Sequence, residues 1–152
     1  MYSQIRNISI AGHGQTGKTT LTEQILFFGG TIPKPETVEN GKTTSDYTSE
    51  EIERKISIHS SLSNINWEST KINIFDTPGS SDFIGEVISS FRACGSNLLL
   101  IGAEAGVQIG TIRIWRRLNK INKPRIIFVN KMDKEHADFT KVLADIKEKF
   151  KA

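Results

Sequence analysis

Residues 12–19 carry the groups needed to hold a phosphate chain. They read GHGQTGKT and fit the phosphate-binding pattern G-x-x-x-x-G-K-[ST]. The backbone N–H groups of such a loop converge on an anion, and the dipole of the helix that follows favours negative charge. Lys18 is expected to reach the β- and γ-phosphates, and the Thr19 hydroxyl to bind Mg²⁺. The loop consists of Gly12, His13, Gly14, Gln15, Thr16, Gly17, Lys18 and Thr19.

A second motif, DTPG at residues 76–79, could bind the far end of that phosphate chain. The Asp76 carboxylate could hold Mg²⁺ through water. Gly79 has no side chain, so its N–H group can approach a γ-phosphate closely. Loss of that phosphate would release the segment, which predicts an order–disorder switch. We assign nucleotide binding to Asp76, Thr77, Pro78 and Gly79.

A third motif, NKMD at residues 130–133, could select the base. A carboxylate such as that of Asp133 can accept two hydrogen bonds from the ring N–H and the amino group of guanine. Adenine offers no matching pair of donors and would leave the charge unpaired. The Lys131 stem can pack along the base plane. The alternative is that Asp133 only caps a helix. The assigned residues are Asn130, Lys131, Met132 and Asp133.

Each motif follows a segment that is typical of a β-strand, at residues 5–10, 71–75 and 125–129. Any one motif could arise by chance, because glycine, lysine and threonine also cluster in surface turns. Ligands of open α/β sheets bind at the carboxyl ends of parallel strands, so three motifs at three strand ends indicate one nucleotide site. The alternation of strands and helices predicts the α/β P-loop NTPase fold, with three α/β/α layers and a mostly parallel sheet.

Apolar residues at helical spacing predict four helices that pack into a core. Their stripes are Leu21, Ile25 and Phe28; Ile84, Val87, Ile88 and Phe91; Thr111, Ile114, Trp115 and Leu118; and Phe139, Val142, Leu143, Ile146 and Phe150. Two continuous apolar runs, residues 98–101 and 126–129, predict strands that are buried on both faces.

The chain between the first helix and the second motif is expected to be mostly loop. Residues 29–54 are polar, contain glycine and proline and show no apolar period, so we predict a long functional or disordered loop. Ile56 and Ile58 alternate with serines, which predicts a strand. A turn near Glu68 and Ser69 should join a strand to residues 71–75 as a hairpin.

Composition places the chain among globular proteins of one domain. Its 152 residues are 37% hydrophobic and 24% charged. No signal peptide is visible, and the longest apolar run is too short to span a bilayer. The lone Cys94 excludes an internal disulfide, suits a reducing compartment and is interpreted as a core residue. We therefore expect a cytoplasmic protein without membrane or DNA partners.

Positive charge gathers late in the chain. Residues 107–134 hold eight basic residues and one acid, whereas the net charge of the whole chain is only +3. Two interpretations stay open, a solvated helix face and a surface that contacts RNA phosphates. The basic residues are Arg113, Arg116, Arg117, Lys120, Lys123, Arg125, Lys131 and Lys134.

The sequence resembles the translational GTPases, and elongation factor G among them. The loop of that family reads GHIDAGKTT, and residues 12–20 read GHGQTGKTT. Its first switch ends in ERGITI, and residues 53–58 read ERKISI. Its DTPGHVDF corresponds to DTPGSSDF at residues 76–83, and its FVNKMD is intact at residues 128–133. The resemblance covers nearly the whole chain.

The resemblance implies a GTP-binding and GTP-hydrolysing domain that uses Mg²⁺, cycles between GTP and GDP and works on the ribosome, contacting rRNA and ribosomal proteins. It adds Thr20 to the nucleotide-binding loop. It implies Mg²⁺ ligands at Thr19, Ser57 and Asp76. It implies catalytic positions at Lys18, Gly79 and Ser80.

Three departures distinguish this chain from the family pattern. Ser80 stands where the family has a histidine that orients the attacking water, and a serine is not a base near pH 7. Ser57 replaces the switch threonine, and Gln15 replaces the loop aspartate. These changes favour an elongation-factor-G-like paralogue over the main translocase.

The family domain also continues with a further base-contacting loop, a last strand and a last helix, and nothing here matches them. Residues 1–152 are therefore expected to be one GTP-binding domain that is incomplete at its C-terminus, with residues 126–129 at an open sheet edge. Three functions stay open: a GTP hydrolase, a guanine-nucleotide-binding module with negligible hydrolysis, and an inert fragment. A kinase is less favoured, because residues 130–133 point to guanine.

Overall fold

The computed structural model describes residues 4–151. Five strands form one sheet in the order β2-β3-β1-β4-β5. The strands are β1 (Gln4–Gly12), β2 (Ser61–Trp67), β3 (Thr70–Asp76), β4 (Ser96–Gly102) and β5 (Arg125–Asn130). Neighbouring strands run parallel except β2, which pairs antiparallel with β3. The expected fold, an α/β sheet that is mostly parallel, is confirmed.

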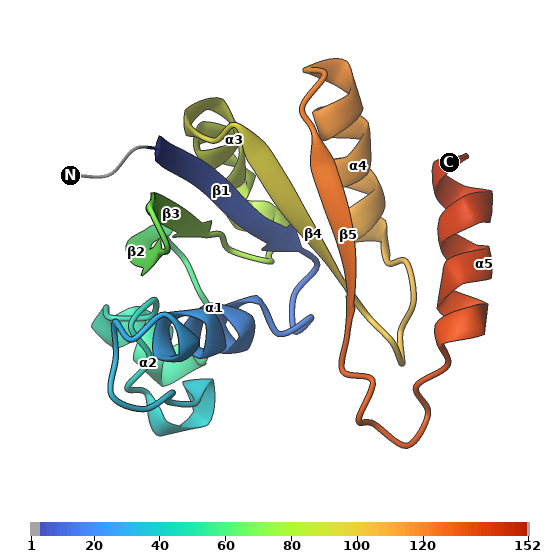
Figure 1. Cartoon of the computed structure of the whole chain (residues 1–152). Coiled ribbons are helices and arrows are strands. Elements are labelled where there is room, and N and C mark those ends of the chain that lie inside the picture. Colours follow the sequence, from blue (N-terminus) through green and yellow to red (C-terminus); the bar gives the residue numbers. More distant parts are fainter. Residues whose placement is uncertain (1–3, 152) are drawn as a thin grey trace.

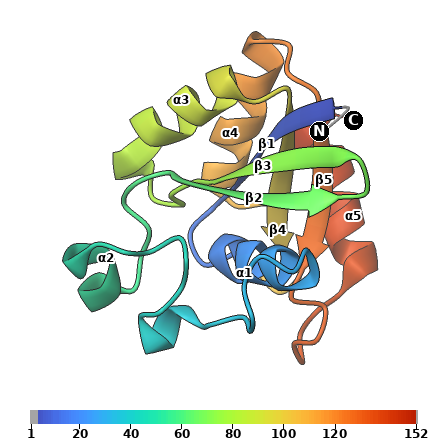
Figure 2. The ribbon, with the colours of Figure 1, turned by 60° about the vertical axis from the view of Figure 1, so that its left-hand side comes forward.

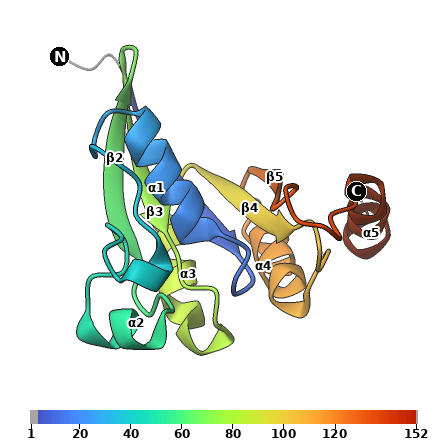
Figure 3. The same cartoon turned by 90° about the horizontal axis from the view of Figure 1, so that it is seen from below.

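Helices cover both faces of the sheet (Figures 1 and 3). The α-helices are α1 (Lys18–Phe28), α2 (Ser49–Arg54), α3 (Ile84–Ala93), α4 (Ile109–Lys120) and α5 (Phe139–Phe150), and 3₁₀ turns occupy Val38–Asn40 and Ser81–Phe83. α1 packs on one face over a core that includes Ile10, Ile74 and Leu100. α3, α4 and α5 pack on the other face around Leu99 and Ile101. None of the helices described here is long and apolar enough to cross a membrane.

The hairpin expected near Glu68 forms as predicted. β2 and β3 are joined by two residues, and Trp67 pairs with Thr70 across the turn. Glu68 adopts a positive φ of 51°, as a tight hairpin turn requires. β3 ends at Asp76. Because β3 and β1 pair in parallel, their carboxyl ends lie side by side.

The strand predicted at Ile56 and Ile58 is wrong. Residues 56–58 lie outside the sheet, and β2 begins only at Ser61. The backbone N–H groups of Ile58 and His59 donate instead to the buried carboxylate of Glu51, at 2.9 and 3.0 Å. A side chain of α2 thus takes the donors that a sheet ladder would need.

The loop predicted for residues 29–54 is only partly correct, because the segment contains α2. Thr48 and Glu51 form a capping box, in which the Thr48 hydroxyl accepts from the Glu51 N–H and the Glu51 carboxylate accepts from the Thr48 N–H. Local side-chain hydrogen bonds, rather than apolar periodicity, hold this helix.

Burial departs from the predicted stripes at helix ends and at the sheet edge. Phe28 is 76% exposed, because α1 turns Leu26 to the sheet instead. β4 is buried as predicted, but Ile126 of β5 is 70% exposed and Phe128 is also exposed. β5 is an edge strand, as expected, and α1 does not extend over it (Figure 3). Ile84, Phe139 and Leu143 are likewise exposed members of their stripes.

Candidate nucleotide-binding site

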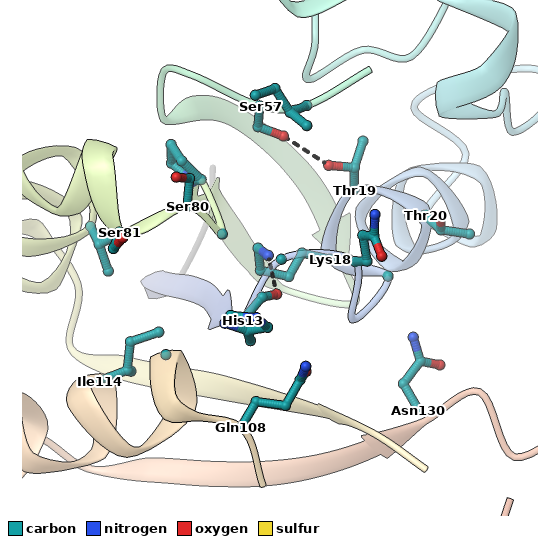
Figure 4. A pocket seen from close by; sticks show the side chains of 18 of the residues that line it. His13, Lys18, Thr19, Thr20, Ser57, Ser80, Ser81, Gln108, Ile114 and Asn130 are labelled. Atoms are coloured by element: carbon teal, nitrogen blue, oxygen red, sulfur yellow. Dashed lines mark hydrogen bonds between the residues drawn. The ribbon is translucent and has the colours of Figure 1, made fainter. Parts of the chain in front are cut away.

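The phosphate-binding loop connects the end of β1 to the start of α1, where the strand and the helix N-terminus meet. Gly17 caps α1 with φ of 88°, a left-handed conformation that favours glycine. The Lys18 ammonium donates to the carbonyl of His13 at 2.9 Å, so the lysine folds back over the loop (Figure 4). Burial lowers the pKa of Lys18 to about 8, against the opposing negative charges of Asp76 and Asp46.

The second motif lies directly against this loop. A Cβ atom added at Gly79 would lie 2.6 Å from Lys18 Nζ and 2.7 Å from Gly14 Cα. Only glycine fits that approach without a shift of the loop. Thr77 is buried, and its N–H and hydroxyl both donate to the carbonyl of Ile10, at 3.2 and 2.8 Å. Thr77 therefore fixes the motif to β1 rather than facing a ligand.

The third motif is joined to the first by a hydrogen bond. The Asn130 side-chain amide donates to the carbonyl of Thr16 at 2.9 Å, from the end of β5 to the phosphate-binding loop. Lys131 has φ of 62°, which turns the chain sharply after the strand. Lys131 and Asp133 line the same cleft as the phosphate-binding loop, whereas Met132, which is 47% exposed, does not line it.

Four oxygen-bearing side chains meet at the start of α1. The hydroxyls of Thr19 and Ser57 lie 3.3 Å apart, and either could donate (Figure 4). Asp76 and Asp46 are 1% and 4% exposed, and no carboxylate oxygen of either has a hydrogen-bond partner of good geometry among the described residues. Buried carboxylates and hydroxyls are the donors that a hard divalent cation prefers, so these residues fit Mg²⁺.

Burial also perturbs the two carboxyl groups. It raises the pKa of Asp76 to about 6, although the charge of Lys18 and the nearby hydroxyls of Thr19 and Ser45 oppose the rise. It raises the pKa of Asp46 as well, with the Ser57 hydroxyl acting in the opposite direction. A bound cation would favour the ionised form of both groups.

Asp46 lines the candidate site, and no pattern in the sequence predicted it. It lies in the segment predicted as featureless loop, 30 residues before Asp76 in the chain, and no local pattern marks it. Glu51 was detectable, because Thr48-x-x-Glu51 matches the capping-box pattern. The sequence analysis assigned no role to Glu23 either, although Glu23 follows Thr19 by one turn on the same face of α1.

Ser80 lies at the edge of the cleft, beside Ser81 (Figure 4). Its hydroxyl accepts the Asp82 N–H at 3.3 Å and so caps the turn before α3. A hydroxyl in this position can orient a water but cannot take up its proton near pH 7.

The cleft has a volume of about 1380 Å³ and continues between α3 and α4, where Arg113 and Arg117 line it. Two other residues of the basic stretch have structural contacts. The Arg125 guanidinium lies over the Trp115 ring at 4.4 Å, and the Lys123 ammonium donates to the Cys94 carbonyl at 2.6 Å. Cys94 itself is buried, as expected for a core residue.

The arrangement of these motifs is matched by a known family. Residues 3–152 match the elongation factor Tu GTP binding domain. The chain belongs to that family. This GTP-binding domain is 44% identical over 150 residues to a mitochondrial ribosome-releasing factor 2 of Drosophila ananassae, covering 99% of this chain and 20% of that protein. It is 43% identical to elongation factor G 1 of Treponema denticola, covering 99% of this chain and 22% of that protein.

A solved structure from Thermus thermophilus matches the GTP-binding domain with a TM-score of 0.91 and 35% identity. The match covers 95% of this chain and 22% of that one. The resemblance to translational GTPases of the elongation factor G type is thus confirmed. The GTP-binding domain spans about a fifth of the length of the curated relatives that it matches.

Proposed function

We propose that this chain binds and hydrolyses GTP as part of a ribosome-associated translation factor of the elongation factor G type. The observation that carries the proposal is the 2.9 Å hydrogen bond from Asn130 to Thr16, which holds the base-reading motif against the phosphate-binding loop. One ligand with a base and phosphates can then contact both motifs. Guanine is selected by the Asp133 carboxylate, and the phosphates lie on the loop at the N-terminus of α1.

The residues at the phosphate end would act by position and charge. The buried Lys18 ammonium would stabilise the phosphate oxygens. Because Gly79 has no side chain, the second motif can lie against Gly14, so that backbone N–H groups of both segments could reach the same phosphates. Thr19, Ser57 and Asp76, together with Asp46, would hold Mg²⁺. The bound cation would neutralise charge on the phosphate oxygens during phosphoryl transfer.

Guanine selectivity gives the direct test. Asp133→Asn should weaken GDP binding by about 2 kcal/mol or more, because a charge-assisted pair of hydrogen bonds is lost. Glu135→Gln is the matched control, since it removes an exposed carboxylate two residues away. Calorimetry with GDP and ADP measures both affinities. Equal binding of the two nucleotides by the parent would overturn the proposal.

A second candidate function is a guanine-nucleotide-binding module with negligible hydrolysis. It is favoured by Ser80, whose hydroxyl is held as a cap by Asp82 and offers no imidazole to an attacking water. Single-turnover GTP cleavage by the full-length protein, with and without ribosomes, separates the two functions. Cleavage that ribosomes accelerate supports the hydrolase, and tight binding without cleavage supports the module.

The ribosome is proposed as partner because relatives are named elongation factor G and ribosome-releasing factor. Co-sedimentation of the full-length protein with ribosomes in the presence of a non-hydrolysable GTP analogue tests this. The compartment stays a prediction. The sequence predicts the cytoplasm, and the Drosophila relative is named mitochondrial, so fractionation of the source cells should distinguish these two sites of translation.

A further inference from the structure

The carboxylate of Glu23 binds the segment that carries Asp46. It is only 1% exposed, and its two oxygens accept different backbone N–H groups. One accepts from Glu36 at 3.0 Å and the other from Thr44 at 2.6 Å. The two donors are eight residues apart, so one side chain holds both ends of a loop against α1. Figures 1 and 2 both show the chain between α1 and α2 running alongside α1.

The same helix face presents the cation-binding hydroxyl. Thr19 and Glu23 are four residues apart on α1 and therefore lie one above the other. Thr19 contacts Ser57 at 3.3 Å, and Glu23 contacts Thr44, two residues before the buried Asp46. α1 thus contacts this part of the chain at two positions, Thr19 and Glu23. The Asp46 carboxylate lies near the position of Thr19.

Burial of the Glu23 charge is compensated only while the segment is in place. A buried carboxylate is costly unless hydrogen bonds satisfy it, and both bonds come from this segment. Departure of residues 36–44 would leave two backbone donors and two carboxylate oxygens without their present partners. These two hydrogen bonds therefore favour the position of the segment over the site.

We propose that Glu23 is a positioning residue for Mg²⁺: by holding the N–H groups of Glu36 and Thr44, it places Asp46 beside Thr19 and Ser57. The inference rests on the proposed function, since it concerns the cation that accompanies the nucleotide. Glu23 does not line the cleft, so we expect it to act through this segment rather than by contact with the nucleotide or the cation.

The test compares Glu23→Gln with the control Glu53→Gln in the full-length protein. A carboxamide can accept from one N–H group but presents its own donors to the other, so one tether is lost. Glu53 is an exposed glutamate of α2, which follows this segment in the chain. In nucleotide-free protein, hydrogen exchange at the Glu36 and Thr44 amides should become faster in Glu23→Gln and stay at the parent rate in Glu53→Gln.

The second readout is the release of fluorescent GDP with Mg²⁺ and with EDTA. Residues that orient metal ligands typically change metal affinity by about 10-fold to 100-fold when replaced, so Glu23→Gln should release GDP about 10-fold faster in Mg²⁺. Release in EDTA should match the parent. A purely structural role would speed release in both buffers and lower the melting temperature, and this result would overturn the proposal. Release of GDP from Glu23→Gln at the parent rate in Mg²⁺ would also overturn the proposal.

Asp46→Asn tests the route of the effect. If Glu23 acts by placing Asp46, the double variant of Glu23→Gln and Asp46→Asn should release GDP no faster than the faster of the two single variants. A release rate in which the two single effects multiply would overturn this route. If Glu23→Gln fails to fold, Thr44→Pro removes the same hydrogen bond from the segment side. Should the parent fail to bind GDP at all, the proposed function falls, whereas the exchange measurement still tests the tether.

Discussion

The side-chain amide of Asn130 donates to the carbonyl of Thr16 across 114 positions of sequence. The bond joins the end of the edge strand β5 to the loop before α1. A residue of the motif that we propose to bind the base therefore also supports residues 12–19, and its loss should affect the binding of both the base and the phosphates.

Asn130→Ala is expected to weaken binding of GDP and of inorganic pyrophosphate alike. The loss should be about 1–3 kcal/mol, because the buried Thr16 carbonyl loses its hydrogen-bond partner and the loop loses a support. Asp133→Asn is the comparison, since it should weaken GDP binding and leave pyrophosphate binding unchanged. Isothermal titration with both ligands measures this. Unchanged pyrophosphate affinity in Asn130→Ala would show that the bond does not support the loop.

Lys18→Ala should abolish tight GDP binding, because Lys18 is the one full positive charge within residues 12–19. Thr19→Ala should leave binding in EDTA unchanged and remove the gain from Mg²⁺. Thr140→Ala is the control, since Thr140 is an exposed threonine of α5 that does not line the cleft. Fluorescence titration of labelled GDP in both buffers distinguishes the three variants. Parental affinity in Lys18→Ala would contradict the assignment of the loop.

Glu51→Gln should destabilise the fold at neutral pH. The Glu51 carboxylate is buried, and although burial by itself raises its pKa, hydrogen bonds from His59, Ile58 and Thr48 lower the pKa below its usual value. A carboxylate whose pKa is lower in the folded state than in the unfolded state stabilises the protein at pH values above the unfolded-state pKa. This contribution is lost as the pH falls through the folded-state pKa.

The expected loss for Glu51→Gln at pH 7 is about 1–3 kcal/mol, the cost of leaving buried N–H donors unpaired. The difference in the free energy of unfolding between Glu51→Gln and the parent should shrink as the pH falls below the ordinary pKa of glutamate. Urea unfolding at several pH values measures both, with Glu50→Gln on the exposed side of α2 as control. A difference independent of pH would show that the charge of Glu51 is not what matters.

Ser80→His should raise GTP cleavage only modestly without ribosomes. Phosphoryl transfer depends on positioning and electrostatics, so an imidazole near the water acts only when the surrounding loop is held in place. On ribosomes the parent should cleave more slowly than Ser80→His. Single-turnover cleavage by both full-length proteins decides this. Fast cleavage by the parent, unchanged by the substitution, would show that another group orients the water.

The local patterns of the sequence were enough to predict four of the five α-helices that the structure describes, most of the sheet and the positions of the three motifs. β4 is a buried apolar run, the turn at Glu68 is a two-residue hairpin, and residues 12–19 connect strand to helix as predicted. These features depend on residues that are close in sequence, since periodicity and turn chemistry act over a few positions. That the three motifs meet at one end of the sheet follows from parallel strand order.

Only the tertiary structure decided which side chains complete the site. Glu23 and Thr16 acquire their roles through hydrogen-bond partners 13 to 114 positions away, and no local pattern encodes such contacts. Asp46 likewise lies near Asp76, which follows it by 30 positions in the chain. The same reason explains the wrong strand at Ile56, because a carboxylate from α2 takes the donors that a strand would use. Ile126 reads like a buried residue, yet its exposure depends on how far α1 extends across the sheet. Long-range packing determines whether α1 covers β5, and the residues of β5 by themselves do not indicate it.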